Sequence, residues 1–279
     1  VKMNTQDKTR FDYWKRMEFS LDQWRELKEH CEEAGVEFLA SPFSNAAVDL
    51  LEKLEVKRYK IGSGEITNFL LLEKIAQTGK PVILSSGMSS FAELDNAVNF
   101  LKEKGVNYSI LQCTTAYPTT PENYGLNVIQ QLKERYKVSV GYSDHSAKME
   151  TCIAATSLGA EILEIHAVFS RNSFGPDASS SLEIDEITQL IKAVKNIKTA
   201  MENPVDKADN SKFTDLKNIF EKSLAINKDL PANHILSFED LEAKKPKGYG
   251  IDANKFLEVL NKPLKRNMKK WEFLNEGDI

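Results

Sequence analysis

Cysteine, histidine and long apolar runs are scarce in this sequence of 279 residues. The three cysteines (Cys31, Cys113 and Cys152) have no short spacing, which excludes a zinc-finger pattern and a disulfide framework. A formal net charge of −4 argues against general nucleic-acid binding, which needs a basic surface. No run approaches membrane-spanning length, and the polar start lacks the apolar core of a signal peptide. We therefore expect a cytoplasmic protein with reduced thiols and neither a nucleic-acid nor a membrane partner.

The sequence instead alternates between short apolar runs and amphipathic segments. The apolar runs, each bounded by Gly, Pro or polar residues, predict strands at 36–43, 58–64, 81–87, 108–115, 138–145 and 161–169. Segments with an apolar period of about 3.6 residues predict helices at 21–35, 45–56, 69–79, 91–105, 125–136, 149–159 and 181–201. Because such apolar strands must be covered on both faces, they imply a parallel sheet.

Two architectures share this alternation, namely the (β/α)8 barrel and the doubly wound sheet. The predicted strands all end in small or polar residues, such as SPFS, GSGE and SDH. A doubly wound sheet concentrates its chemistry at one switch point, whereas a barrel carries it at the carboxyl ends of all its strands. We therefore predict an α/β fold, a (β/α)8 TIM barrel, with two of its strands unaccounted for.

The pattern changes after a polar segment that contains a proline. Residues 203–213, NPVDKADNSKF, predict a linker between a barrel domain at 1–202 and a compact second domain at 214–279. In the second domain we expect short strands, turns and one short helix near 254–260.

Two of the four histidines, His145 and His166, close successive apolar runs. Imidazoles that project from adjacent strand ends can converge on one divalent metal. Two protein ligands leave positions open for water and substrate, which is typical of a catalytic metal. The alternative is that each histidine only satisfies nearby backbone groups, and the residues alone leave both possibilities open.

Hydroxyl groups gather at the same predicted strand ends. Together with Lys60, they can form a ring of donors around a phosphate or a carboxylate. The alternative for the hydroxyls is helix N-capping. Glu65 ends KIGSGE and is a candidate general acid or base, with capping again as the alternative. Asp177 follows a Gly-Pro turn, so it is either a site carboxylate or a turn former.

Several ordered motifs resemble one family. KIGSGE (60–65), LSSGM (84–88), QCTTAYPT (112–119), GYSDHS (141–146) and EIHAVFSRNSFGPD (164–177) are similar to motifs of the sialic acid synthases, including legionaminic and pseudaminic acid synthases and spore coat polysaccharide relatives. The resemblance implies a metal-dependent condensation of phosphoenolpyruvate with an N-acetylhexosamine, either N-acetylmannosamine or a related diacetamido sugar, with release of phosphate. It also implies that residues 214–279 form a SAF (antifreeze-like) domain and that the protein is a domain-swapped homodimer.

The same resemblance assigns roles to individual residues. His145 and His166 match the metal ligands, usually for Mn²⁺, with Mg²⁺ or Co²⁺ as alternatives. Glu65 matches a proton-transfer residue, and Asp177 matches a carboxylate that binds sugar hydroxyls. The positions that hold or line the phosphoenolpyruvate pocket are matched by Ser41, Lys60, Ser63, Ser85, Thr115, Tyr117 and Ser143.

Two departures from the family pattern carry expectations of their own. The family's first two strands have no counterpart here, so we expect a barrel that lacks about 60 residues and an isolated chain that is unstable or inactive, because an open barrel exposes strand edges. Lys245 stands where the family offers an arginine to the sugar's N-acetyl group, and lysine cannot make the same planar contact. The alternatives are another phosphoenolpyruvate-dependent 3-deoxy-aldulosonate synthase or aldolase, or a non-catalytic accessory protein of polysaccharide biosynthesis.

Overall fold

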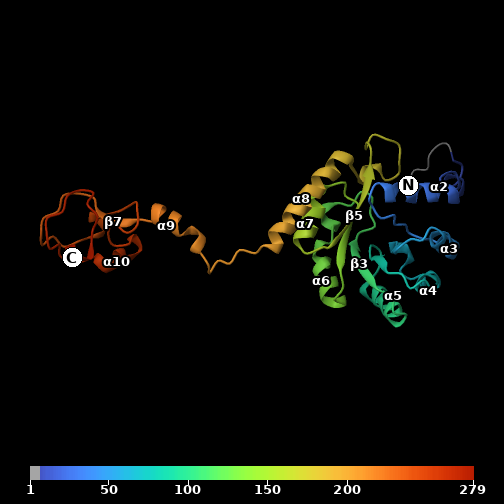
Figure 1. The fold of residues 1–279 in the computed structure, drawn as a ribbon, viewed down its shortest axis with the longest axis horizontal. Coiled ribbons are helices and arrows are strands. Elements are labelled where there is room, and N and C mark those ends of the chain that lie inside the picture. Colours follow the sequence, from blue (N-terminus) through green and yellow to red (C-terminus); the bar gives the residue numbers. More distant parts are fainter. Residues whose placement is uncertain (1–6) are drawn as a thin grey trace. The chain divides into compact units, whose positions relative to one another are not determined.

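Six short strands form one parallel sheet in a computed structural model of the chain, which describes residues 7–279. The order of the strands in the sheet is their order in the chain, and all five pairings are parallel, as predicted. The sheet curls into a half-barrel (Figure 1). The strands are β1 (Tyr59–Ile61), β2 (Val82–Ser85), β3 (Tyr108–Cys113), β4 (Val140–Asp144), β5 (Ile162–Val168) and β6 (Ser181–Glu183).

Helices separate most of the strands and pack against the sheet, α6 on β3 and β4, and α8 on β5 (Figure 1). Several helices begin at the side-chain caps expected of Ser and Asn, and Ser20 and Ser90 form full capping boxes. The helices of this part are α1 (Arg10–Arg16), α2 (Leu21–Glu33), α3 (Asn45–Lys53), α4 (Phe69–Ala76), α5 (Phe91–Glu103), α6 (Leu126–Tyr136), α7 (Met149–Ser157) and α8 (Ile184–Glu202).

The core lies between the sheet and these helices. Every residue of β1 and β2 is buried, Lys60 and Ser85 included, which agrees with strands that are covered on both faces. Leu84, Ile110 and Val140, on three neighbouring strands, are fully buried. Each such side chain contributes about 1.5–3 kcal/mol by leaving water. The buried strands therefore fix where their carboxyl ends, and the polar residues that follow them, lie.

Two predicted elements are wrong. Residues 36–43 do not form a strand, because the amide of Lys60 donates to the carbonyl of Ala40 without a ladder, and Val36 and Phe43 are exposed. The predicted helix at 181–201 begins as β6, because Ser181 pairs with His166, and α8 starts only at Ile184. No helix was predicted for α1.

The chain divides after Asn203, and residues 204–279 form a second compact unit. In this unit β7 (Ser223–Ile226) pairs antiparallel with β8 (Leu241–Lys244), and α10 (Phe256–Val259) lies where a short helix was predicted. The helix α9 (Thr214–Phe220) was not predicted. The unit has its own apolar core, which includes Leu224 and Leu264. Across residues 7–279, no helix combines the length and apolar character that a membrane crossing requires.

Candidate active site

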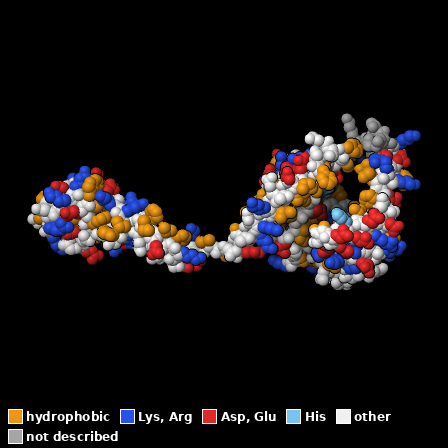
Figure 2. Space-filling model, turned by 45° about the horizontal axis from the view of Figure 1, so that its top comes forward, with side chains coloured by type: hydrophobic (Ala, Val, Ile, Leu, Met, Phe, Trp, Pro, Cys, Tyr) orange, Lys and Arg blue, Asp and Glu red, His pale blue; other side chains and the backbone are white. Residues whose placement is uncertain are grey.

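His145 and His166 lie side by side at the carboxyl ends of β4 and β5. Their ring centroids are 5.1 Å apart, and the planes meet at 76°. His145 is 5% exposed, whereas 32% of the His166 side chain is exposed. Figure 2 shows histidine atoms in a hollow on one face of the first unit. The predicted convergence of these two imidazoles is therefore seen in the structure.

The hydrogen bond of His145 fixes which of its nitrogens is free. The Nδ1 atom lies 2.9 Å from the carbonyl oxygen of Thr114, which can only accept, so Nδ1 carries the proton. In the neutral ring the Nε2 lone pair is then free for a ligand. Burial lowers the pKa of His145 below its usual value, which favours this neutral form.

Tyr117 and Asp177 border the histidine pair. The ring of Tyr117 stacks on His145 with centroids 4.1 Å apart, and its centroid is 5.6 Å from that of His166. Burial raises the pKa of Tyr117 to about 12, so the phenol keeps its proton at neutral pH. The carboxylate of Asp177 lies 3.8 Å from Nδ1 of His166. We call Tyr117, His166 and Asp177 the rim of the site.

Beside the histidines lies a buried group of donors on β1, β2 and β4. Lys60, Ser85 and Ser143 are each less than a tenth exposed. The Nζ atom of Lys60 lies 3.2 Å from a carboxylate oxygen of Glu164, and the Ser143 hydroxyl donates to the other oxygen at 2.7 Å. We call Lys60, Ser85, Ser143 and His145 the floor of the site. Glu164 shows that the floor can bind a carboxylate.

A close approach at Gly87 joins the loops above the floor. The Gly87 amide donates to the hydroxyl of Ser63 at 3.0 Å. A Cβ atom at Gly87 would lie 2.5 Å from the Thr115 hydroxyl, 2.8 Å from the Ser63 hydroxyl and 2.9 Å from the Cys113 sulfur. Only glycine therefore permits this packing. The capping alternative fails for Ser63, Ser85 and Ser143, since none of them caps a helix by a side-chain hydrogen bond.

The remaining predicted residues have mixed positions. Ser41 is half-buried and directly follows Ala40, whose carbonyl binds the Lys60 amide. The carboxylate of Glu65 accepts from the Asn68 side chain at 2.7 Å, beside the start of α4. Lys245 lies in the second unit, where its Nζ atom is 4.4 Å from the centre of the Phe220 ring. Lys245 is thus outside the unit that carries all the other predicted residues.

Two site residues, Glu164 and Cys113, were missed. Glu164 precedes His166 by two residues, so strand alternation places both on the same face of β5. Cys113 is paired in register with Ser143, which is paired with Glu164, so the three form one row across β3, β4 and β5. Burial raises the pKa of the Cys113 thiol, while the hydroxyls of Ser143, Ser85 and Ser63 act against this rise. Strand alternation could have identified Glu164, but the register that places Cys113 requires the fold.

The histidine pair has the spacing that a shared metal requires. At metal–nitrogen bonds of about 2.1 Å and bond angles near 90–110°, two coordinating imidazoles have centroids roughly 5 Å apart. The separation of 5.1 Å between the ring centroids and the free Nε2 atom of His145 fit this arrangement. Within residues 7–279, no group of three or more His, Cys, Asp or Glu side chains is arranged to hold a metal. Any metal here would rely on two protein ligands and keep its other positions for water or substrate.

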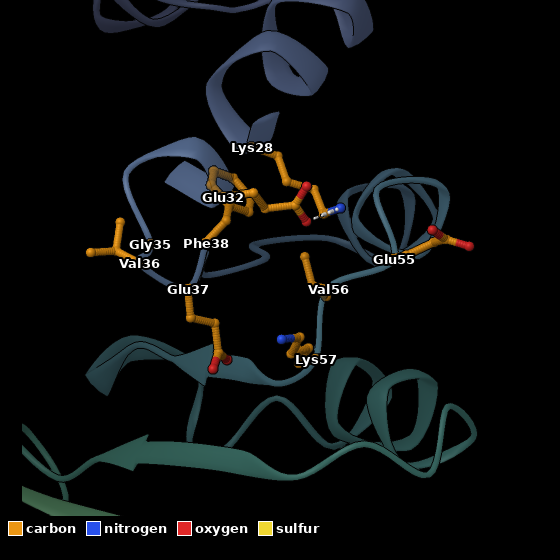
Figure 3. Close-up of a pocket in the computed structure, with 9 residues that line it drawn as sticks. All are labelled: Lys28, Glu32, Gly35, Val36, Glu37, Phe38, Glu55, Val56 and Lys57. Carbon is orange, nitrogen blue, oxygen red and sulfur yellow. Dashed lines mark ion pairs between the residues drawn. The ribbon is translucent and has the colours of Figure 1, made fainter. Parts of the chain in front are cut away.

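A separate pocket lies near α2. It has a volume of about 390 Å³, and its lining includes Glu37, Val56 and the ion pair between Lys28 and Glu32, whose atoms are 2.7 Å apart (Figure 3). Part of its lining, residues 55–57, lies just before β1. None of the residues that line the pocket is a predicted site residue. The pocket is therefore at the amino end of β1, away from the strand ends that carry the floor.

Comparisons with known proteins agree on one family. Residues 1–206 match the NeuB family. The chain is 37% identical over 279 residues to an N,N'-diacetyllegionaminic acid synthase of Campylobacter jejuni, which covers 99% of this chain and 83% of the relative. It is 36% identical over 251 residues to the human N-acetylneuraminate-9-phosphate synthase, which covers 87% of this chain and 68% of the relative.

The fold agrees with a solved structure of the same kind. The N-acetylneuraminic acid synthetase of Leptospira borgpetersenii, in complex with citrate, superposes with a TM-score of 0.67 at 32% identity. The superposition covers 72% of this chain and 70% of that chain.

Proposed function

The chain belongs to the NeuB family, and from this premise we propose that it condenses phosphoenolpyruvate with an open-chain N-acetylhexosamine and releases phosphate. N-acetylmannosamine or a related diacetamido sugar is the proposed acceptor, since relatives are named as synthases of diacetyllegionaminic acid and N-acetylneuraminate 9-phosphate. One observation carries the proposal: the buried floor and two adjacent imidazoles lie at one edge of one sheet.

We assign the anionic end of phosphoenolpyruvate to Lys60 and to the hydroxyls of Ser63, Ser85 and Ser143. Ammonium and hydroxyl donors in a buried site form strong, charge-assisted hydrogen bonds to phosphate and carboxylate oxygens. Lys60 and Ser143 already hold the carboxylate of Glu164, so an arriving anion exchanges one acceptor for another. Ser41, Thr115 and Tyr117 line the same pocket in this proposal.

We assign His145 and His166 to a divalent metal, with Mn²⁺ proposed and Mg²⁺ or Co²⁺ as alternatives. When bound, such an ion supplies Lewis-acid polarisation of a carbonyl oxygen. The protein's part is to keep His145 neutral and to aim it by its bond to the Thr114 carbonyl.

The proposed reaction forms a carbon–carbon bond and a carbon–oxygen bond from water, and it breaks the carbon–oxygen bond to phosphate. Carbon 3 of phosphoenolpyruvate bonds to the aldehyde carbon of the sugar, whose oxygen gains a proton. Water adds at carbon 2 and gives up one proton, which balances the proton gained by the sugar oxygen. The carbon–oxygen bond to phosphate then breaks, and the hydroxyl at carbon 2 passes its remaining proton to the departing phosphate to leave a ketone. We assign the sugar hydroxyls to Asp177 and a proton transfer to Glu65, which the Asn68 amide holds in place.

We also propose the larger assembly that the family resemblance implies. In this proposal the six-stranded sheet is part of a (β/α)8 barrel, residues 203–213 are a linker, and residues 214–279 are a SAF domain. Two chains form a domain-swapped homodimer in the cytoplasm, and Lys245 faces the sugar's N-acetyl group. Light scattering tests the dimer, for which the expected mass is twice the 31.5 kDa of this chain.

Phosphate release tests the proposed function. The protein is incubated with phosphoenolpyruvate, Mn²⁺ and each candidate sugar, and the product is identified by mass spectrometry. We expect phosphate release only with sugar present, with EDTA abolishing it. Turnover that survives EDTA, or that is unchanged in His145→Ala, contradicts the metal assignment. Phosphate release with no sugar adduct contradicts the condensation.

A further inference from the structure

The loop at residues 169–177 carries Asp177 but has little apolar anchoring. It connects β5 to the short 3-10 helix at Ala178–Ser180. Its two large apolar side chains face solvent, with Phe169 92% exposed and Phe174 77% exposed. Because burial does not hold this loop, its position depends on polar contacts.

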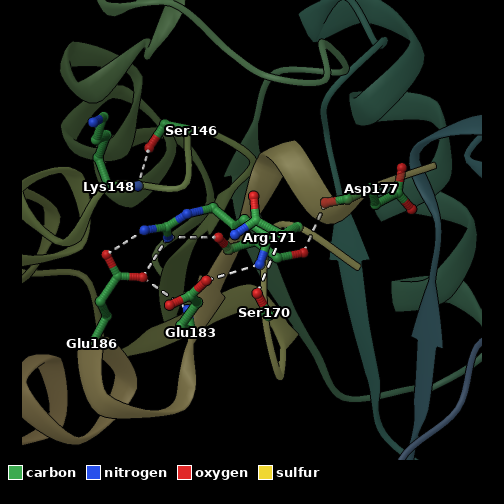
Figure 4. Close-up of polar contacts among 9 residues, drawn as sticks. Ser146, Lys148, Ser170, Arg171, Asp177, Glu183 and Glu186 are labelled. Atoms are coloured by element: carbon green, nitrogen blue, oxygen red, sulfur yellow. Dashed lines mark hydrogen bonds and ion pairs between the residues drawn. The ribbon is translucent and has the colours of Figure 1, made fainter. Parts of the chain in front are cut away.

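Arg171 makes the contacts that tie the loop down (Figure 4). Its backbone amide donates to the Glu183 carboxylate at 2.8 Å, and its guanidinium forms a two-pronged pair with Glu186. The guanidinium also donates to the Ser181 carbonyl at 3.2 Å. Among residues 7–279, these four hydrogen bonds are the ones that join residues 169–176 to β6 and α8. One residue thus anchors the loop, through three bonds of its side chain and one of its backbone amide.

The partners of Arg171 are themselves fixed. Glu186 is the third residue of α8 and accepts from the Glu183 amide at 2.8 Å, as part of a capping box. Ser181 is paired with His166 across the sheet, and its hydroxyl donates to the Asp177 carbonyl at 2.8 Å. The loop is therefore held at both ends by β6. The pairing of the same strand with β5 also fixes the position of His166.

We propose that Arg171 is a positioning residue that fixes Asp177 against the histidine pair and so sets the affinity for the aminosugar. The inference rests on the proposed function, because it takes Asp177 as the carboxylate that binds the sugar. Arg171 itself lies outside the floor and the rim. Its effect passes through the loop, so it should act on the sugar and leave phosphoenolpyruvate binding unchanged.

The first test measures KM for each substrate separately. For Arg171→Ala we expect the KM for the aminosugar to rise about tenfold or more, since a misplaced group about 1 Å from its productive position is costly. The KM for phosphoenolpyruvate should stay within about twofold because the floor lies on other strands. Arg171→Lys should fall between, since lysine keeps the charge but not the fork. Glu186→Gln keeps an acceptor for the Glu183 amide, and it should reproduce the rise.

Arg135→Ala is the matched control. Arg135 forms a similar two-pronged pair with Asp95, joining α5 and α6 with comparable exposure of its side chain. We expect both alanine variants to lose similar thermal stability, while only Arg171→Ala changes the KM for sugar. Equal kinetics in the two variants, or an equal rise in KM for both substrates of Arg171→Ala, overturns the proposal.

A second readout separates this inference from the proposed function. Chymotrypsin cleaves after exposed Phe169 and Phe174 only when the loop opens, and this needs no substrate. We expect cleavage there to be about tenfold faster in Arg171→Ala than in the wild type or Arg135→Ala, because the loop loses the three side-chain bonds of its anchor. Unchanged cleavage overturns the loop anchor even if turnover is normal. If Arg171→Ala is cleaved faster but the wild type shows no turnover, the proposed function is refuted and the role of Arg171 as the loop anchor stands.

Discussion

The floor and the rim of the candidate site are built in different ways. The floor residues Lys60, Ser85 and Ser143 lie within strands, and His145 directly follows one; all are less than a tenth exposed. On the rim, Tyr117 and Asp177 lie on loops, and about half of each side chain is exposed. Backbone ladders hold the floor and His166, whereas stacking and hydrogen bonds hold Tyr117 and Asp177.

This difference indicates how the two substrates are treated. A buried floor on a ladder presents fixed donors to the anion of the proposed substrate phosphoenolpyruvate. A rim on loops can change its contacts without disturbing the core. We infer that the floor sets the chemistry and the rim sets which sugar enters, and the predictions below test that division.

Lys60→Met should have the largest effect. It removes the one cation of the floor, and charged hydrogen bonds of this kind contribute about 1.5–3 kcal/mol, so kcat/KM for phosphoenolpyruvate should fall roughly 10- to 150-fold. Steady-state phosphate release measures this. Lys80→Met is the control, because Lys80 pairs with Glu52 rather than with any site residue. An equal loss in both variants would mean that Lys60 acts only through stability.

Gly87→Ala should reduce kcat/KM for phosphoenolpyruvate by about tenfold or more. The added methyl must displace the hydroxyls of Ser63 and Thr115, and groups moved from their productive positions are costly. The effect should appear in KM for phosphoenolpyruvate. Gly277→Ala is the control, since a Cβ there meets nothing within 4 Å. A normal KM in Gly87→Ala would show that the floor tolerates movement and would break the comparison.

Asp177→Asn should weaken sugar binding by about tenfold, which is the loss expected when a charged hydrogen-bond acceptor becomes neutral. Separate titrations of the two substrates measure it. The KM for phosphoenolpyruvate should be unchanged because Asp177 belongs to the rim. If that KM rises instead, floor and rim do not act independently.

Tyr117→Phe should have the smallest effect, less than about threefold on kcat, because the stacked ring remains. Tyr117→Ala should cost more, about 2- to 13-fold, since aromatic stacking is worth about 0.5–1.5 kcal/mol. Comparing kcat of the two variants measures the stack. A large loss in Tyr117→Phe would assign the main role to the hydroxyl rather than to the ring on His145.

Sequence reasoning found the floor because strands have a local pattern. Apolar runs such as PVILSSG locate both the strand and the polar group at its end, and parallel pairing brings those ends together. Every predicted floor residue, from Lys60 to His145, lies in a strand or directly after one, toward the carboxyl ends of the strands, where it was predicted.

The rim and the sheet edges were harder to predict because their contacts join residues that have no shared local pattern. The apolar run at residues 36–43 predicted a strand, yet whether a segment pairs depends on the strands beside it and not on its apolar content. The anchor between Arg171 and Glu186 spans a loop and a helix start, and nothing in the spacing of two charges reveals it. Glu164 was within reach of strand alternation, but its link to Lys60 needed the curl of the sheet.

Calorimetric titration of Mn²⁺ tests the central claim, that His145 and His166 bind one metal beside the floor. We predict one Mn²⁺ per chain in the wild type. Either His145→Ala or His166→Ala should weaken Mn²⁺ binding at least about tenfold, because mutating a residue that only supports a metal ligand already lowers metal affinity by about that much. His30→Ala, a change at an exposed histidine on α2, should bind as the wild type does. Wild-type affinity for Mn²⁺ in both site variants would contradict the account.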